Sequence, residues 1–232
     1  MPLDHFSALH PDYDGWSTDA LLRHLLTEAF PRRIAIVSSF GAESAVLLHH
    51  VAAIDPATPV LFVDTGKLFA ETLAYRETLC WRLGLTAIRT VTAPDAVLTA
   101  VDPVGALWQT DPDLCCEHRK VAPLDAALIG YDAWITGRKR FQGGGREALP
   151  VVEAGRPVKA NPLANWTEAD IAAYRTLHSL PPHPLEAQGY RSIGCAPCTR
   201  VPAAGEASRA GRWAGLGKTE CGIHLPRTRT AA

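Results

Sequence analysis

Six cysteines supply the residues of this 232-residue chain that are best suited to chemistry. Four of them form two tight pairs, the adjacent Cys115 and Cys116 and, far downstream, Cys195 and Cys198. Two such pairs can close four thiolates around one metal centre. Cys80 lies within a helical pattern, where a free thiol packs as a small hydrophobic side chain. The two pairs therefore predict a metal site.

The paired cysteines are also compatible with packed core thiols, with disulfides and with zinc. Disulfides need an oxidising compartment, and residues 1–30 lack the apolar run and small-residue cleavage site of a secretory signal. Zinc sites usually draw on two Cys-x-x-Cys knuckles, from which directly adjacent cysteines depart. An iron–sulfur cluster is therefore favoured over zinc, and a cytoplasmic location over export.

The remaining cysteine, Cys221, stands apart from both pairs in the sequence Glu-Cys-Gly-Ile-His, which ends at His224. The thiolate is the nucleophilic form of a cysteine, and nearby cations favour it. A glycine-rich terminal segment would let this thiol close over a ligand and swing out again. The pattern predicts a nucleophile at Cys221 rather than an inert surface thiol, with His224 positioning the segment or binding an anion.

The composition excludes two classes of partner. A formal net charge of −1 gives no broad basic field, so binding to nucleic acid is not expected. The apolar runs are too short to cross a bilayer, so we expect no membrane association. Cationic residues nevertheless cluster locally, which suggests one compact anionic ligand. They are Arg119, Lys120, Arg138, Lys139, Arg140, Arg146, Arg209 and Arg212.

The elements that must position these residues alternate between short β-branched runs and helical patterns. This order predicts an α/β fold with a doubly wound, mostly parallel sheet and helices on both faces. Residues 1–202 are expected to form a nucleotide-binding domain that carries the metal site, and residues 203–232 a loop-rich, mobile tail with Cys221. Strands are expected at residues 34–37, 60–63, 88–91 and 134–136, and helices at 42–53, 68–83 and 168–177.

Small, hydroxyl and charged residues follow three of the expected strands. In doubly wound sheets, ligands bind at the carboxyl ends of the strands, where backbone N–H groups and a helix N-terminus favour an anion. The loops match neither the P-loop ending nor the dinucleotide glycine pattern, yet together they indicate a nucleotide-like ligand. The residues are Ser38, Ser39 and Gly41 after the first strand, Asp64, Thr65 and Gly66 after the second, and Gly137 and Arg138 after the fourth.

From about residue 20 to 225 the sequence resembles the sulfonucleotide reductases, which reduce adenylyl sulfate or its 3′-phosphorylated form to sulfite. The resemblance implies an adenine nucleotide alpha hydrolase-like fold. The ending around Cys221, together with the paired cysteines, makes the match specific. The shared motifs span residues 38–43, 63–69, 115–120, 136–140, 192–199, 211–213 and 220–224.

The same resemblance implies a role for each site residue. The two cysteine pairs would hold a [4Fe-4S] cluster that carries no electrons, as in members that take adenylyl sulfate. Cys221 would attack the sulfate sulfur and release AMP, and thioredoxin (or glutaredoxin) would then discharge the S-sulfonate as sulfite. Lys120 would lie between cluster and substrate, and Arg146, Arg209 and Arg212 would face the phosphosulfate.

Other functions remain open at this point. A reductase of the 3′-phospho form, or of both substrates, would share most of these motifs. An adenylating sulfur-transfer enzyme of related fold would need a Ser-Gly-Gly-x-Asp-Ser loop, where residues 39–44 read Ser-Phe-Gly-Ala-Glu-Ser. A non-catalytic zinc or iron–sulfur module would leave Cys221 and the nucleotide loop unexplained. A homo-oligomer is compatible with all of these functions.

Overall fold

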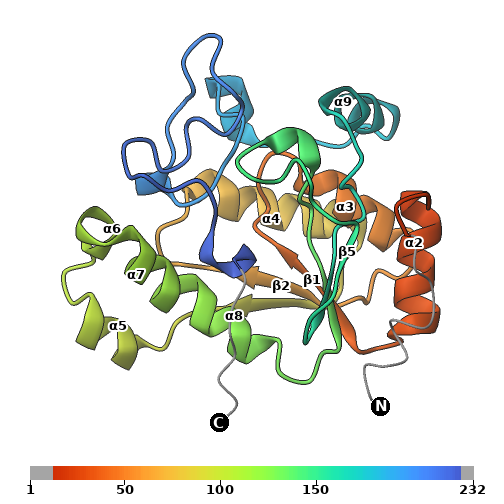
Figure 1. Cartoon of the computed structure of the whole chain (residues 1–232), viewed down its shortest axis with the longest axis horizontal. Helices are drawn as coiled ribbons and strands as arrows, with labels where there is room; N and C mark the ends of the chain where they lie inside the picture. The colour runs from red at the N-terminus through yellow and green to blue at the C-terminus, as the bar shows by residue number, and fades with distance from the viewer. Residues whose placement is uncertain (1–12, 226–232) are drawn as a thin grey trace.

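A parallel sheet organises the computed structural model, which describes residues 13–225. Within these residues six strands follow the order β3-β2-β1-β4-β6-β5, and all neighbours pair in parallel except β5 and β6 (Figure 1). The predicted α/β fold with a mostly parallel sheet is confirmed. The outer parts of the expected 1–202 and 203–232 units, residues 1–12 and 226–232, lie outside the described residues.

The strand order reverses at the centre of the sheet. Ile36 of β1 lies beside Val60 of β2 on one side and Ile135 of β4 on the other. Loops that follow β1 and β4 therefore diverge at the carboxyl edge, which is where doubly wound sheets bind ligands. The strands are β1 Ile34–Ser38, β2 Val60–Val63, β3 Ile88–Val91, β4 Ala133–Ile135, β5 Val152–Glu153 and β6 Val158–Ala160.

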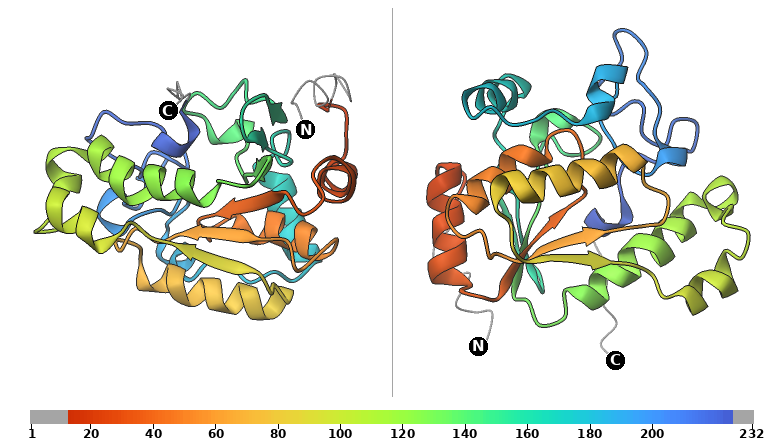
Figure 2. Two further views of the ribbon diagram at one scale, coloured as in Figure 1. Left: turned by 90° about the horizontal axis from the view of Figure 1, so that it is seen from below. Right: turned by 180° about the vertical axis from the view of Figure 1, so that it is seen from behind.

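Helices cover both faces of the sheet. Figure 2 shows α3 and α4 against one face and the run from α7 to α8 against the other. Within residues 13–225 the α-helices are α2 Thr18–His24, α3 Ser44–Ala52, α4 Ala70–Leu83, α5 Asp95–Val101, α6 Leu107–Thr110, α7 Pro112–Cys116, α8 Ala122–Ala127 and α9 Glu168–Leu177. The same residues include the π-helical segments η1 Leu25–Ala29 and η2 Glu117–Val121 and the 3-10 turns η3 Arg140–Gln142, η4 Pro184–Gln188, η5 Ala196–Cys198 and η6 Gly222–His224.

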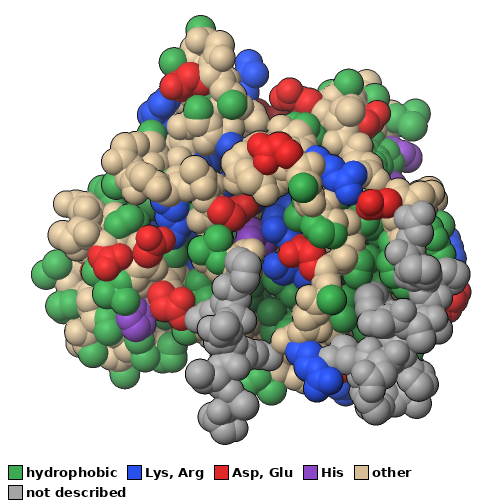
Figure 3. Space-filling model, in the orientation of Figure 1, with side chains coloured by type: hydrophobic (Ala, Val, Ile, Leu, Met, Phe, Trp, Pro, Cys, Tyr) green, Lys and Arg blue, Asp and Glu red, His purple; other side chains and the backbone are tan. Residues whose placement is uncertain are grey.

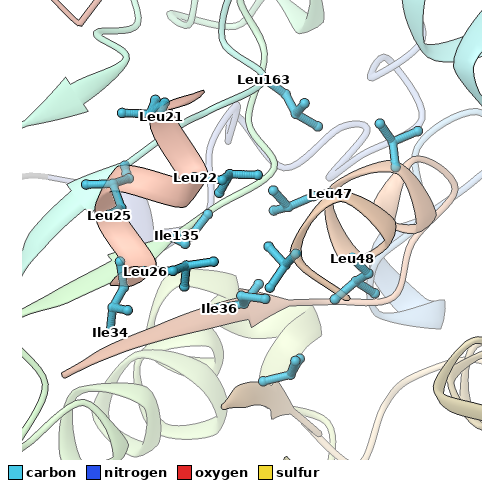
Figure 4. Close-up of a cluster of buried hydrophobic side chains, with 14 of the residues drawn as sticks. Leu21, Leu22, Leu25, Leu26, Ile34, Ile36, Leu47, Leu48, Ile135 and Leu163 are labelled. Atoms are coloured by element: carbon cyan, nitrogen blue, oxygen red, sulfur yellow. The ribbon is translucent and has the colours of Figure 1, made fainter. Parts of the chain in front are cut away.

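The main core lies between the sheet, α2 with η1, and α3. Leu21, Leu22 and Leu25 recur at helical spacing and are at most 1% exposed. They belong to one buried cluster with Ile36 of β1 and Leu48 of α3, both fully buried, and Leu22 points toward Leu47 of α3 (Figure 4). Strand β1 is buried on both faces, which accounts for its continuous apolar run. Within residues 13–225, every helix is too short or too polar to cross a membrane.

The chain after α9 returns to the carboxyl edge of the sheet through loops and short turns. The segment around η5 is tied to the loop after β2, because the Ala196 N–H donates to the Lys67 carbonyl at 2.7 Å and Leu68 bridges to Cys195. Turn η6 lies against η2. Cysteines that are far apart in the sequence are thereby brought to the same end of the sheet as the loops after β1 and β4.

Candidate functional site

A cavity of about 200 Å³ opens at the carboxyl ends of β1 and β4. Its walls come from the loops after these strands and from the segment between residues 191 and 224. Figure 3 shows basic, acidic and histidine side chains gathered at the centre of this face. The lining carboxylates are Glu43 and Glu220. The more numerous lining cations are Lys120, Arg138, Lys139, Arg146, Arg191, Arg209 and Arg212.

The loop after β1 turns through a strained residue. Phe40 has a φ of 49°, and its fully buried ring packs edge-on against Phe62. The Phe40 N–H donates to the Ser38 hydroxyl at 3.2 Å. A non-glycine residue in the left-handed region persists only where packing holds it, and such residues cluster at functional sites. This turn leaves Ser39 and Gly41 on the cavity wall.

The loop after β4 carries cations that are already paired. The Lys139 ammonium, which is 2% exposed, donates to Glu43 at 2.8 Å and to the Gly137 carbonyl at 2.7 Å. Arg138 is ion-paired with Glu153. Because a buried charge is tolerated only with a partner, these two cations shape the wall of the cavity and contribute less to its net positive charge.

Arg212 enters the cavity from a second strained turn. The Trp213 N–H donates to the Cys198 carbonyl at 2.9 Å, and Trp213 has a φ of 51°. The Arg212 guanidinium lies 4.4 Å from the centre of the Trp213 ring, and its Nε is buried without a hydrogen-bond partner among the described residues. A Cβ on Gly194 would lie 2.2 Å from the guanidinium, so only glycine allows this approach.

Arg146 and Arg209 converge on Glu220. Arg146 donates to the two carboxylate oxygens at 2.5 and 2.8 Å, and Arg209 donates to one of them at 3.3 Å. Burial and the charge of Arg146 lower the pKa of Arg209 to about 10. Burial alone would raise the pKa of Glu220, but the hydrogen bond and charge of Arg146 outweigh it and lower that pKa. The same carboxylate accepts the N–H of Cys221 at 2.8 Å.

The Cys221 thiol lies at the wall of the cavity and is 8% exposed, packed with Cys198 and Trp213. A hydrogen bond with Cys116 lowers the pKa of Cys221, burial raises it, and the positive charges of Lys120 and Arg212 lower it further, so the net shift is downward. The thiolate is the reactive form. The surroundings therefore favour a nucleophile at this position.

His224 lies beyond Cys221 and is neutral near pH 7. Its ring is parallel to Trp134 of β4, with 6.0 Å between the ring centres. Burial and the charges of Arg138 and Arg146 lower the pKa of His224 well below its ordinary value. Its Nδ1 is buried and has no hydrogen-bond partner within the described part of the chain. An imidazole nitrogen without a partner can take a hydrogen bond from, or give one to, a ligand.

The paired cysteines line a second, smaller cavity. Within residues 13–225 no three His, Cys, Asp or Glu side chains are arranged around a single-ion site. Tetrahedral zinc with bonds of about 2.3 Å would need its four sulfurs roughly 3.8 Å apart. An iron–sulfur cluster, in contrast, binds each thiolate to a different iron. The cysteines that line this cavity are Cys115, Cys116, Cys195 and Cys198.

The donor set of the second cavity fits a sulfur-ligated centre, because clustered thiolates are soft ligands that suit iron–sulfur clusters and zinc. Lys120, Arg212 and Trp213 line both cavities and so form the wall between them. The two cations stand where they can balance the negative charge of thiolates on one side and of an anionic ligand on the other.

The structure brings most of the residues predicted from the sequence to the first cavity. They are Ser38, Ser39, Gly41, Lys120, Gly137, Arg138, Arg146, Arg209, Arg212, Cys221 and His224. Asp64, Thr65 and Gly66 do not line it. The Gly66 N–H donates to Asp64 at 2.9 Å, and the Thr65 hydroxyl lies 3.2 Å from the Cys195 sulfur, on the side of the second cavity.

Two of the clustered cations serve the scaffold instead of the cavity. Arg119 donates to Asp102 at 2.7 Å and to the Thr65 carbonyl at 3.0 Å, and so fixes the loop after β2. Arg140 donates to the Leu149 carbonyl at 2.9 Å and pairs with Asp14 at 3.1 Å. Both arginines lie outside the lining of the cavity. The positions of Arg119 and Arg140 in the sequence did not distinguish these two arginines from the cations that line the cavity.

Glu220 and Gly194 are among the site residues that the sequence analysis missed. Glu220 directly precedes Cys221 in the sequence. A carboxylate is not expected at a site for anions, so its place there could be recognised only once its arginine partners were known. Gly194 precedes Cys195, and a lone glycine in a loop does not reveal which side chain will approach it. Only the tertiary structure shows both contacts.

The fold and the cavity define an α/β protein that presents a thiol at the wall of a cation-lined cavity, at the edge of a parallel sheet. The family model described as "Phosphoadenosine phosphosulfate reductase domain" matches residues 33–201. The chain belongs to this family.

Relatives are similar over nearly their whole length. An adenosine 5′-phosphosulfate reductase from Mesorhizobium japonicum is 50% identical over 97% of this chain and 93% of its own. An enzyme of the same name from Streptomyces coelicolor is 42% identical over 85% of this chain and 84% of its own.

Solved structures share the fold. A phosphoadenylyl-sulfate reductase from Candida auris, in complex with phosphate, has a TM-score of 0.69 at 26% identity and covers 86% of this chain and 98% of its own. An FMN adenylyltransferase from Candida glabrata has a TM-score of 0.54 at 16% identity, covering 77% and 61%, which is a likeness of fold alone.

Proposed function

We propose that this chain reduces adenylyl sulfate to sulfite and AMP in sulfate assimilation, with thioredoxin (or glutaredoxin) as electron donor. The observation that carries the proposal is the position of the Cys221 thiol, at the wall of a cationic cavity at the carboxyl edge of the sheet. Relatives that are 50% and 42% identical are named for reduction of this nucleotide, which supports the same substrate here.

In the proposed complex the adenosine part of the substrate occupies the loops after β1 and β4. The phosphosulfate faces the side chains of Lys120 and Arg212, which form no ion pair with a described carboxylate, and Arg146 and Arg209 beside them. Phosphate in the related Candida auris structure supports an anion site in this fold. Arginine forks suit such oxyanions because they can donate two parallel hydrogen bonds.

The proposed first step is attack of the Cys221 thiolate on the sulfate sulfur. A sulfur–sulfur bond forms, the bond from sulfur to the phosphate oxygen breaks, and its electron pair leaves with AMP. An anionic nucleophile and an anionic sulfonyl group repel one another unless cations neutralise them, and Lys120 and Arg212 are positioned for this. The product is an S-sulfonate on Cys221.

The proposed second step releases the sulfonate as sulfite, and the two electrons come from the thiols of the donor, which becomes a disulfide. A donor thiolate attacks the Cys221 sulfur, sulfite leaves with the electron pair, and a second donor thiol resolves the mixed disulfide. Cys221 is buried in the described state, so the segment from residue 203 must move to expose it. A reducing compartment, the cytoplasm, is consistent with a free thiol in this role.

We further propose that Cys115, Cys116, Cys195 and Cys198 hold one [4Fe-4S] cluster. Its support is that all four thiols line the second cavity and that clustered thiolates suit iron–sulfur clusters. The cluster would supply fixed negative charge beside Lys120 and Arg212 and would carry no electrons. Because Lys120 and Arg212 line both cavities, this charge would hold the two side chains toward the substrate.

Purified protein should release sulfite from adenylyl sulfate when thioredoxin is supplied under anaerobic conditions. Turnover should be much slower with the 3′-phospho form. Cys221→Ser should abolish sulfite release, whereas Cys80→Ser, which changes a thiol on α4 away from both cavities, should retain it. Faster turnover of the 3′-phospho form would assign the alternative substrate, and sulfite release by Cys221→Ser would contradict the proposed chemistry.

Protein prepared without oxygen should contain iron and acid-labile sulfide in near-equal amounts, at about four of each per chain. Cys198→Ser should lose most of this iron, while Cys80→Ser should keep it. Stoichiometric zinc without sulfide, measured by elemental analysis, would show that the second cavity binds a different centre.

Gly194→Ala should lower kcat/KM for adenylyl sulfate by about 30-fold or more, because a positioned cation contributes roughly 2–4 kcal/mol to transition-state stabilisation. The added methyl group would displace the end of the flexible Arg212 side chain, so the fold should survive. Gly15→Ala adds the same group where nothing lies within 4 Å and serves as the control. Equal kinetics for the two variants would show that the position of Arg212 is unimportant.

A further inference from the structure

Glu220 holds the place that an anionic ligand would take. Its carboxylate receives two hydrogen bonds from Arg146 and one from Arg209. A planar carboxylate held by an arginine fork has the same charge sign and donor geometry as a bound phosphate or sulfate. The acidic side chain is 12% exposed and that of Arg146 is 7% exposed, so the pair is largely shielded from water.

All three guanidinium nitrogens of Arg146 are engaged in this arrangement, through three of its five N–H donors. Its Nε and one terminal nitrogen contact Glu220, and the other terminal nitrogen donates to the Gln142 side chain. A phosphosulfate can therefore take the paired donors of Arg146 that face Glu220 only if the carboxylate moves away. Lys120 and Arg212, in contrast, have no ion pair within residues 13–225 and can receive an anion at once.

Displacement of Glu220 would reach the nucleophile directly. The carboxylate accepts the N–H of Cys221 in addition to its arginine contacts. Arg209 also donates to the Thr219 carbonyl at 3.2 Å, so the backbone on both sides of Glu220 depends on the same interactions. When these contacts are exchanged for contacts to a ligand, the segment that carries Cys221 loses its attachment to the cavity wall.

We propose that Glu220 is a displaceable counter-ion. It neutralises Arg146 and Arg209 when the cavity holds no sulfonucleotide, and the substrate anion replaces it, freeing the Cys221 segment. Glu220 is thus a positioning residue that couples the filling of the cavity to the release of the nucleophile. The inference rests on the proposed function, because it requires the phosphosulfate to bind at these arginines.

A permanent brace is the competing role for Glu220, and it predicts the opposite change in affinity. If the carboxylate only orients the two arginines, its removal should weaken substrate binding. If it competes with substrate, its removal should strengthen binding, because a ligand that must displace an internal group binds with only the fraction of molecules in which the site is free.

The test measures the affinity for adenylyl sulfate by calorimetry in cluster-loaded, full-length protein. Cys221→Ser is the common background, so that no sulfonate is transferred during the titration. Adding Glu220→Gln should tighten binding on the order of tenfold, and adding Glu220→Asp, which keeps the charge, should change it less. Adding Glu206→Gln is the matched control, since Glu206 pairs with Arg200 on the same segment but outside the cavity.

Protease digestion gives a second readout on the same proteins. Without nucleotide, Glu220→Gln should be cleaved within residues 203–225 as fast as the background protein is cleaved when nucleotide is bound. If Glu220→Gln, with intact cluster absorbance, bound adenylyl sulfate with unchanged or weaker affinity, the displacement of Glu220 by substrate would be contradicted. The proposed function would still stand. Absence of adenylyl-sulfate binding in the background protein and in every variant would overturn the proposed function, and the exchange with it.

Discussion

Repulsion among cations confined to one small cavity is the constraint on which the site depends. Arg146, Arg209, Arg212 and Lys120 approach one another at the carboxyl edge of the sheet, where burial removes much of the water that would otherwise screen them. Such a group of charges is stable only with negative partners. The described state provides two of them, the Glu220 carboxylate and the Cys221 thiol with its lowered pKa. Burial, and then the charge of Arg146, lower the pKa of Arg209. The positive charge of the same group of cations favours the thiolate and attracts an anionic substrate.

The scaffold meets this constraint by fixing the cations from several directions. Lys120 comes from a π-helical segment, which is an uncommon backbone form that is frequent at functional sites. Arg212 comes from a turn that holds Trp213 at a positive φ. On the opposite side, Phe40 occupies a positive φ within the loop after β1. The backbone strain at these turns costs free energy of folding. Burial of the large apolar core beneath them offsets this cost, so the site itself need not stabilise the fold.

Much of the fold follows from local sequence, and part of the site does not. The strands β1 to β3 were predicted within a residue of their bounds. Strands β1 and β2 are continuous apolar runs, and β3 is a short run rich in β-branched residues, whereas β5 and β6 are two and three residues long and show no periodicity. The cysteines and most cavity residues were predicted from motifs. Thr65 was expected at the substrate, but its hydroxyl lies beside the Cys195 sulfur. The ends of parallel strands predict which edge of the sheet a loop occupies, but they do not predict in which direction each side chain of that loop points. The role of Glu220 depends on Arg146, which is 74 residues away in the sequence, so no local pattern contains it.

The central claim, that cations and a buried thiol meet around one substrate sulfur, is tested most directly by trapping the first product. Protein mixed with adenylyl sulfate in the absence of any thiol donor should gain the mass of one sulfonate, and peptide mapping should assign it to the peptide that contains Cys221. Subsequent addition of reduced thioredoxin should remove that mass and release one equivalent of sulfite. A sulfonate on one of the paired cysteines, or turnover without any adduct on Cys221, would contradict the account.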